Sequence, residues 1–165
     1  MNDDMTFEVR RLYGTRRVVV DTRAPNLALK KIVLNDKDVT DAAIDFSKDV
    51  EGIEVVLTSK ASRVTGSVSD DKGPVTDFAV IVFASDPTKW IDRSRFVAVA
   101  RPTQEGRFTV SGLPPEDYLA VALPSITGTE FMDPDFLQQL RAQATSFTLM
   151  EGDAKTLELK LKKRP

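Results

Sequence analysis

The sequence predicts an all-β protein, a Greek-key β-sandwich with one short helix, preceded by a truncated β module. Three observations predict this fold class. Apolar and polar residues alternate with a period of two along most of the chain. Short runs of this kind are separated by glycine and proline at intervals of roughly 8–12 residues, which is typical of sandwiches and barrels. Finally, 41% of the 165 residues are hydrophobic, which is enough to build a core.

The first third of the chain shows predicted strands, because β-branched residues recur there with polar residues on the opposite face. They cover residues 6–12, 16–22, 28–34 and 52–58. Part of this pattern returns later, since Phe7 and Val9 align with Phe108 and Val110 at a constant offset (108 − 7 = 101). Three more strand-like runs precede the later copy, whereas only residues 1–5 precede the earlier one. We therefore expect the earlier copy to lack its opening strands.

We expect two modules, as if cut from a longer array. Residues 1–59 would hold only the C-terminal half of a β-sandwich, and residues 60–165 a complete one. A half module cannot bury its apolar faces, and soluble monomers rarely leave more than a few hundred Å² of apolar surface uncovered. The apolar residues concerned include Phe7, Val9, Leu12, Val18, Val20, Ile32, Leu34, Ile53, Val55 and Leu57. We expect other modules of the same parent chain, or a second copy, to cover them.

The second module continues the strand pattern. A strand at residues 64–69 is followed by a turn in which Gly73 accepts positive φ and Pro74 fixes its own φ. Residues 78–85 are nearly all apolar, which predicts a central strand buried on both faces. Further strands are predicted at residues 95–101, 108–110, 146–150 and 155–162.

One segment departs from this pattern and predicts a short helix. Asp133, Pro134 and Asp135 supply an N-cap, a proline at the first helical position and a first-turn acid. The apolar residues that follow fall on one helical stripe and are Phe136, Leu137, Leu140 and Ala144. The helix should cover one edge or end of the sandwich.

Three segments carry a family resemblance: residues 64–68, the pair Gly73 and Pro74, and above all the block 106–122. On these residues the second module resembles the carboxypeptidase regulatory-like domain, a transthyretin-like sandwich of bacterial envelope proteins. Glu116 stands where that family usually has glycine. The resemblance implies an accessory module without catalytic residues, in a parent protein exported to the periplasm, the outer membrane or the cell surface.

Composition excludes several function classes. The chain contains no cysteine and no histidine, so a Ser-His-Asp triad, an iron–sulfur cluster and Cys- or His-type zinc sites are all excluded. We expect no metal and no cofactor. With 23 basic and 25 acidic residues the net charge is −2, and no field of one sign attracts nucleic acid.

The sequence shows neither the pattern of a signal peptide nor that of a membrane-spanning segment. The first residues are acidic and polar, which is unlike a signal peptide. The longest apolar run, residues 78–84, is too short to span a bilayer, so no membrane insertion is expected.

Three groups of residues invite a chemical interpretation. The acidic residues Asp36, Asp38, Asp41 and Asp45 suggest either a weak cation site or a loop that caps its own turns, and their spacing does not match an EF-hand. Ser94 with Lys89 suggests a nucleophilic dyad, but a polar loop would not desolvate the lysine. Glu116 and Asp117 suggest paired acids, although neighbours on a strand point to opposite faces.

Trp90 is the only tryptophan and lies in a predicted loop beside Arg93 and Arg95. It either packs down over the sheet edge, the interpretation we favour, or stacks on a ligand such as a sugar ring. The sequence thus predicts that the chain is not an enzyme but a structural or protein-interaction module of a larger bacterial envelope protein. The alternative is a carbohydrate-binding module that uses Trp90, Arg93 and Arg95, and a hydrolase is a remote third.

Overall fold

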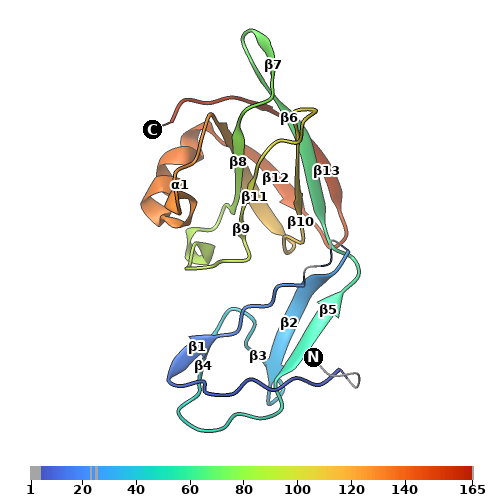
Figure 1. The fold of residues 1–165 in the computed structure, drawn as a ribbon, viewed down its shortest axis with the longest axis vertical. Helices are drawn as coiled ribbons and strands as arrows, with labels where there is room; N and C mark the ends of the chain where they lie inside the picture. Colours follow the sequence, from blue (N-terminus) through green and yellow to red (C-terminus); the bar gives the residue numbers. More distant parts are fainter. Residues whose placement is uncertain (1–4, 23, 25, 165) are drawn as a thin grey trace. The chain divides into compact units, whose positions relative to one another are not determined.

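The structure, a computed structural model, describes residues 5–22, 24 and 26–164 (Figure 1). These residues form two compact units. Unit 1 consists of the described residues up to Asp21 together with Leu29–Leu57, and unit 2 of the described residues from Thr22 to Ala28 and from Thr58 onward. The described residues between Thr22 and Ala28 thus belong to unit 2, whereas the sequence assigned them to the first module. The division at residues 59 and 60 stays a prediction.

Unit 1 contains two small sheets. The first pairs β1 with β4, and the second has the strand order β3-β2-β5. Their bounds are β1 Thr15–Arg17, β2 Ala28–Leu34, β3 Lys37–Asp38, β4 Ala43–Asp45 and β5 Glu54–Thr58. Strands β2 and β3 form a tight hairpin in which Leu34 pairs with Lys37. The two turn residues between them, Asn35 and Asp36, both have positive φ, as a type I′ turn requires.

The strand predicted at residues 6–12 is wrong, because this segment runs outside any strand. Alternation alone does not make a strand, since a strand needs a hydrogen-bonding partner along its edge. The strand predicted at residues 16–22 is reduced to β1. By contrast, β2 has the predicted bounds, and β5 lies within the predicted residues 52–58.

The core of unit 1 is small. Its buried apolar side chains, among the described residues, are Ile32, Ile44 and Phe46. The buried Thr40 stabilises the turn after β3, because its hydroxyl accepts a hydrogen bond from the amide of Ile32 at 2.9 Å. Most other apolar side chains of this unit are exposed or half-buried.

Unit 2 is a β-sandwich, which confirms the predicted fold class. One sheet has the order β10-β6-β13, with β7 also paired to β6, and the other has the order β12-β11-β8-β9. The bounds of the first sheet are β6 Arg63–Asp70, β7 Gly73–Val75, β10 Arg107–Ser111 and β13 Ala154–Lys160. Those of the second are β8 Ala79–Ala84, β9 Val97–Ala100, β11 Glu116–Leu123 and β12 Thr145–Leu149.

The second sheet is buried on both faces, as the apolar run at residues 78–85 predicts. Strand β8 is buried along its whole length. Its residues Val80 and Val82 point between the sheets, where they join Phe108 in the main core. Its residues Ile81 and Phe83 point to the opposite face and pack in a second cluster with side chains from outside the sheet.

The cover of that outer face is the predicted helix, α1 (Pro134–Leu140), which lies against the second sheet in Figure 1. The Asp133 carboxylate caps it by accepting a hydrogen bond from the amide of Asp135 at 2.9 Å. Leu137 and Leu140 are fully buried in the second cluster. Among the described residues, no helix is long and apolar enough to cross a membrane.

In the first sheet, Gly66 allows a close approach between β6 and its neighbours. A Cβ atom at this position would lie 2.1 Å from the carbonyl oxygen of Leu157 on β13 and 2.7 Å from Cε1 of Phe108. Strand β13 runs parallel to β6, from Ala154 opposite Arg63 to Lys160 opposite Ser69. Glycine is therefore required here for spacing, not for turn formation.

The turn before β11 is held by Tyr118. Its ring is fully buried and stacks on Phe147 with a centroid distance of 5.8 Å. Its hydroxyl donates a hydrogen bond to the carbonyl oxygen of Pro114 at 2.9 Å, four residues upstream. This contact is the same kind as the tyrosine corner of immunoglobulin-like sandwiches. Burial, with a smaller contribution from the charge of Glu116, raises the pKa of this hydroxyl above its ordinary value.

Candidate functional site

Trp90 lies at the end of a short 3₁₀ helix, η1 (Pro87–Lys89), which begins at the capping residue Asp86. The indole is only 5% exposed. Its N–H donates a hydrogen bond to the carbonyl oxygen of Ala84 at 2.8 Å, and its ring meets Phe83 edge to face at a centroid distance of 5.6 Å. Trp90 therefore packs over the end of β8, which is the interpretation favoured from the sequence.

This geometry does not fit the stacking platform that the carbohydrate alternative requires. A sugar ring needs an exposed indole face, whereas the Trp90 ring is enclosed by Phe83 and α1 and has the Arg141 guanidinium 5.8 Å from its centroid. The physical reason is the short length of the loop, since the single turn of η1 returns the indole onto the strand it has just left.

The two arginines of the predicted site have different surroundings. The Arg95 guanidinium lies 4.9 Å from the ring centroid of Phe96, which Lys89 also approaches. The Arg93 side chain is exposed, and its backbone has a φ of +50°, in the left-handed region. Ligand binding by these arginines stays a prediction.

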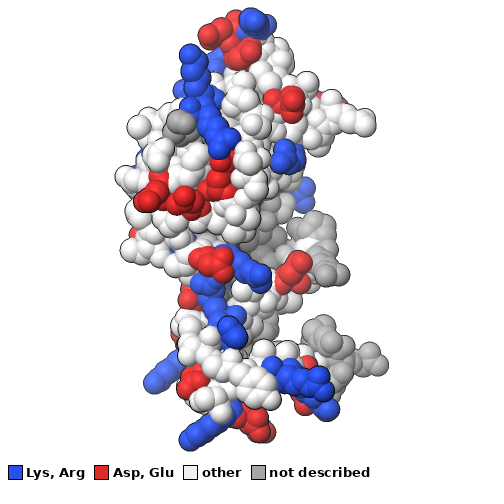
Figure 2. Space-filling view, turned by 60° about the vertical axis from the view of Figure 1, so that its left-hand side comes forward, with Lys and Arg blue, Asp and Glu red and all other residues white. Residues whose placement is uncertain are grey.

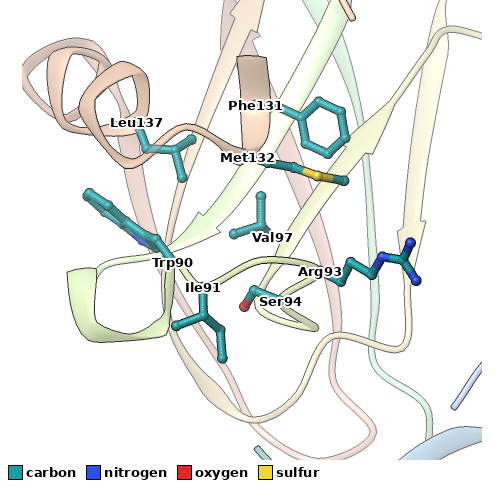
Figure 3. Close-up of a pocket in the computed structure, with 8 residues that line it drawn as sticks. All are labelled: Trp90, Ile91, Arg93, Ser94, Val97, Phe131, Met132 and Leu137. Atoms are coloured by element: carbon teal, nitrogen blue, oxygen red, sulfur yellow. The ribbon is translucent and has the colours of Figure 1, made fainter. Parts of the chain in front are cut away.

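The structure brings Trp90 and Arg93, but not Arg95, to the lining of one surface hollow (Figure 3). The hollow has a volume of about 250 Å³, including the part open to solvent. The other lining residues come from the same loop, from β9 and from the region of α1, and are Ile91, Ser94, Val97, Phe131, Met132 and Leu137. Sequence analysis missed the contribution of Phe131 and Met132. They belong to a second 3₁₀ helix, η2 (Glu130–Met132), whose one-turn length gives no periodic signal.

The structure does not assemble the Ser94–Lys89 dyad. The Ser94 hydroxyl donates to the carbonyl oxygen of Lys89 at 2.5 Å and accepts a hydrogen bond from the amide of Phe96 at 3.1 Å. The Lys89 ammonium forms an ion pair with Glu116. Asp117 turns away from that pair, because its carboxylate accepts a hydrogen bond from the Thr148 hydroxyl at 2.5 Å.

Two of the acidic residues at 36–45, Asp38 and Asp45, cap turns. The Asp38 carboxylate accepts a hydrogen bond from the amide of Thr40 at 2.9 Å. The Asp45 carboxylate accepts hydrogen bonds from the amide and from the hydroxyl of Ser47, each at 2.9 Å. Within the part of the chain that the structure describes, no three acidic side chains gather in a way that could hold a metal ion. Basic and acidic side chains are intermingled on the face shown in Figure 2.

A second feature with functional meaning is the set of exposed apolar side chains in unit 1. Most of them lie in the segment before β1, which belongs to no strand, and two lie later in the chain. The large ones are Met5, Phe7, Val9, Leu12, Tyr13, Val19 and Leu57. The sequence predicted uncovered apolar residues here, among them Phe7, Val9, Leu12 and Leu57. In contrast, the predicted residue Ile32 is fully buried.

No family model matches the chain, and no curated protein matches it. Among solved structures, one match is the dioxygenase domain of a dioxygenase carbohydrate-binding protein fusion from the cellulolytic bacterium Streptomyces sp. SirexAA-E. It is 15% identical, has a TM-score of 0.35, and the match covers 62% of this chain and 79% of that one.

Two further solved structures match at similar levels. Chlorocatechol 1,2-dioxygenase from Pseudomonas putida is 10% identical with a TM-score of 0.34, and the match covers 62% of this chain and 60% of that one. The Bacillus anthracis TIE protein is 11% identical with a TM-score of 0.33, and the match covers 81% of this chain and 22% of that one. None of the three is described as a carboxypeptidase regulatory-like domain, so that resemblance stays a prediction.

These matches correct one expectation. The prediction that the chain is not an enzyme is contradicted, because two of the three structures are dioxygenases, and we withdraw it. At TM-scores of 0.35 and 0.34 the likeness itself carries no argument for a dioxygenase activity in this chain.

Proposed function

We propose that the chain is a structural or protein-interaction part of a larger bacterial cell-envelope protein, in which a partner surface covers the apolar side chains of unit 1. The observation that carries this proposal is the exposure of those side chains. Val9, for example, is 62% exposed. Exposed apolar residues are unremarkable when scattered singly, but a concentration of them in one small unit marks an interaction surface.

The weak core of unit 1 supports the same conclusion. Small folds with little buried apolar surface usually need a partner, a disulfide or a metal for stability. The chain has no cysteine for a disulfide. A partner surface that packs against Phe7 and Val9 would bury their apolar area. Each Å² removed from water would stabilise the unit by about 25 cal/mol.

The segment that carries most of these side chains suits a partner of the β type. It lies outside any strand, and the alternation of apolar and polar residues along it is the pattern of a strand that is added to the edge of a sheet. The Glu8 carboxylate pairs with the Arg10 guanidinium at 2.9 Å on the polar side of this segment, opposite in the alternation to Phe7 and Val9. The resemblance to the carboxypeptidase regulatory-like domain adds the envelope context.

The test is the behaviour of Val9→Asp in the full chain. Met150→Asp is the matched control, because Met150 is also 62% exposed but lies in unit 2. The association state is measured by sedimentation equilibrium, and apolar surface by fluorescence of the dye 8-anilinonaphthalene-1-sulfonate. We expect either a dimer that Val9→Asp dissociates or a monomer whose dye binding Val9→Asp reduces, with the control unchanged in both cases. A monomer in which both variants bind dye as the wild type does would overturn the proposal.

A further inference from the structure

The exposed segment before β1 has a buried counterpart in unit 2. Three apolar residues of the segment align, at the constant offset of 101 residues (108 − 7 = 101), with three residues in and just after β10. The pairs are Phe7 with Phe108, Val9 with Val110 and Leu12 with Leu113. The three residues of unit 2 are buried in the main core, whereas those of unit 1 are 45%, 62% and 38% exposed. One sequence pattern is therefore covered in unit 2 and uncovered in unit 1.

Strand β6 provides the cover in unit 2. It pairs antiparallel with β10, so that Gly66 lies opposite Phe108 and Val64 opposite Val110. The Phe108 ring fills the space above the glycine, since a Cβ atom there would lie 2.7 Å from Cε1 of that ring. The same ring meets Phe78 edge to face at a centroid distance of 6.4 Å. A strand with valine and glycine two residues apart is thus the complement of phenylalanine and valine two residues apart.

The segment of unit 1 already has the side-chain arrangement of a strand. The Arg10 guanidinium donates hydrogen bonds to both carboxylate oxygens of Glu8, at 2.9 and 3.1 Å, so these two side chains lie on the same side of the chain. Side chains two residues apart share a face of a strand, and their neighbours point to the other face. Phe7 and Val9 occupy the alternate positions. The segment nevertheless belongs to no strand, so a neighbouring strand is the element that would complete it.

A second copy of this chain does not offer the complementary strand. Its own β6 is paired on both edges, with β10 on one side and β13 on the other. Releasing β6 would expose Val64 and Val68, which are buried in the main core. The complementary strand must therefore come from a different protein module.

We propose that residues 6–12 accept one antiparallel β-strand from a protein module other than this chain. In this strand a valine lies opposite Val9, a glycine opposite Phe7 and an acidic residue opposite Arg10. The inference rests on the proposed function and deepens it, because it states the chemistry and the register of the partner. The partner's glycine would leave room for the Phe7 ring, and its backbone would form the hydrogen bonds of an added strand.

The position opposite Arg10 distinguishes the partner strand from β6. At the aligned position of unit 2, Ser111 lies opposite Arg63. An arginine opposite Arg10 would place two like charges side by side, which destabilises a sheet, whereas an acidic residue forms a favourable cross-strand pair. The partner therefore follows the pattern Glu/Asp-Val-x-Gly and not the Arg-Val-Thr-Gly of β6.

The test supplies such a strand to the full chain as an amino-terminal extension. The extension is Glu-Val-Thr-Gly-Ser-Val, joined to the first residue by a Gly-Ser linker of about four residues, which gives the strand an effective concentration in roughly the millimolar range. Hydrogen–deuterium exchange is measured by mass spectrometry on proteolytic fragments that cover residues 6–12. We expect exchange there to be about tenfold slower than in the chain without the extension, because paired amides exchange only when the pairing opens.

Altered extensions and one variant serve as matched controls. Leucine in place of the glycine would collide with the Phe7 ring and should reduce the slowing about fivefold or more. Arginine in place of the glutamate should reduce it about two- to fivefold. Val9→Asp with the original extension should show no slowing, whereas Met150→Asp should show all of it. Each protein is compared with the same chain without the extension, and fragments from β8 should exchange alike in all of them, which shows that unit 2 stays folded.

Three results would overturn the inference. The first is exchange at residues 6–12 that the original extension does not slow. The second is equal slowing by the glycine and leucine extensions, since the Phe7 ring then needs no glycine opposite. The third is a dimer of the wild-type chain that Val9→Asp dissociates, because a second copy then covers the segment. If the extension fails but Val9→Asp reduces dye binding by the monomer, the proposed function stands and only this partner strand is rejected.

Discussion

Replacing Trp90 by phenylalanine tests whether this residue is a structural anchor or a solvent-facing platform. The change removes the indole N–H, which is bonded to the carbonyl oxygen of Ala84 at 2.8 Å, and leaves that buried carbonyl without its partner. An orphaned buried acceptor costs about 1–3 kcal/mol. The smaller ring also loses part of its contact with Phe83 and the α1 side, for which we add about 1 kcal/mol. The expected loss in free energy of unfolding is therefore about 2–4 kcal/mol.

The assay is urea unfolding of the full chain followed by circular dichroism. Because the two units can unfold separately, the transition is fitted for unit 2. In a thermal scan of the same variant, at about 4 °C per kcal/mol for a unit of this size, the midpoint of this transition should fall by roughly 8–16 °C. The control is Ile91→Ala, which changes an exposed neighbour in the same loop and should cost well below 1 kcal/mol. If Trp90→Phe lowers the free energy of unfolding as little as the control does, the reasoning is refuted and the indole is not a structural anchor.

Three other changes have defined outcomes in unit 2. Gly66→Ala places a Cβ atom 2.1 Å from the carbonyl of Leu157 and should cost about 3 kcal/mol or more by thermal unfolding, and an unfolding curve like the wild type would contradict this close approach. Burial raises the pKa of Tyr118 above the ordinary 10.0. Above pH 10 the unfolded chain then loses a proton that the folded chain keeps, so stability should fall by up to about 1.4 kcal/mol per pH unit. Urea unfolding at pH 9–11.5 measures this slope, which should be shallower in Tyr118→Phe. Asp133→Ala removes the cap on the amide of Asp135 and should cost about 0.5–2 kcal/mol, whereas Asp133→Asn should restore most of it.

The sequence predicted those elements whose local pattern and long-range partners agree. Strand β8 is an example. Its unbroken apolar run matches a strand with both faces buried, one against the first sheet and the other against α1. The helix is another, since Asp133 and Pro134 fix its beginning and Leu137 and Leu140 its buried stripe. In these cases the residues themselves specify which faces are covered.

Predictions from the sequence were wrong or incomplete where a structure depends on contacts with residues far along the chain. Phe7 and Phe108 share the same local pattern, yet Phe108 lies in β10 opposite Gly66, while Phe7 belongs to no strand. The hollow was only half predicted for a related reason. Trp90 and Arg93 were recognised as neighbours in sequence, but Met132 is brought to them only by the docking of η2 beside α1, and no local pattern reports that contact.

The parallel pairing of β6 with β13 has a mechanical consequence. Tension applied between the start of β6 at Arg63 and the end of β13 at Lys160 would drag these strands in opposite directions along their length. The whole ladder is then loaded in shear, and its hydrogen bonds must rupture together and not one after another as in an unzipping hairpin. Such a module resists pulling, a useful property for a link under load, and single-molecule stretching between these two points would measure the rupture rate that governs its lifetime.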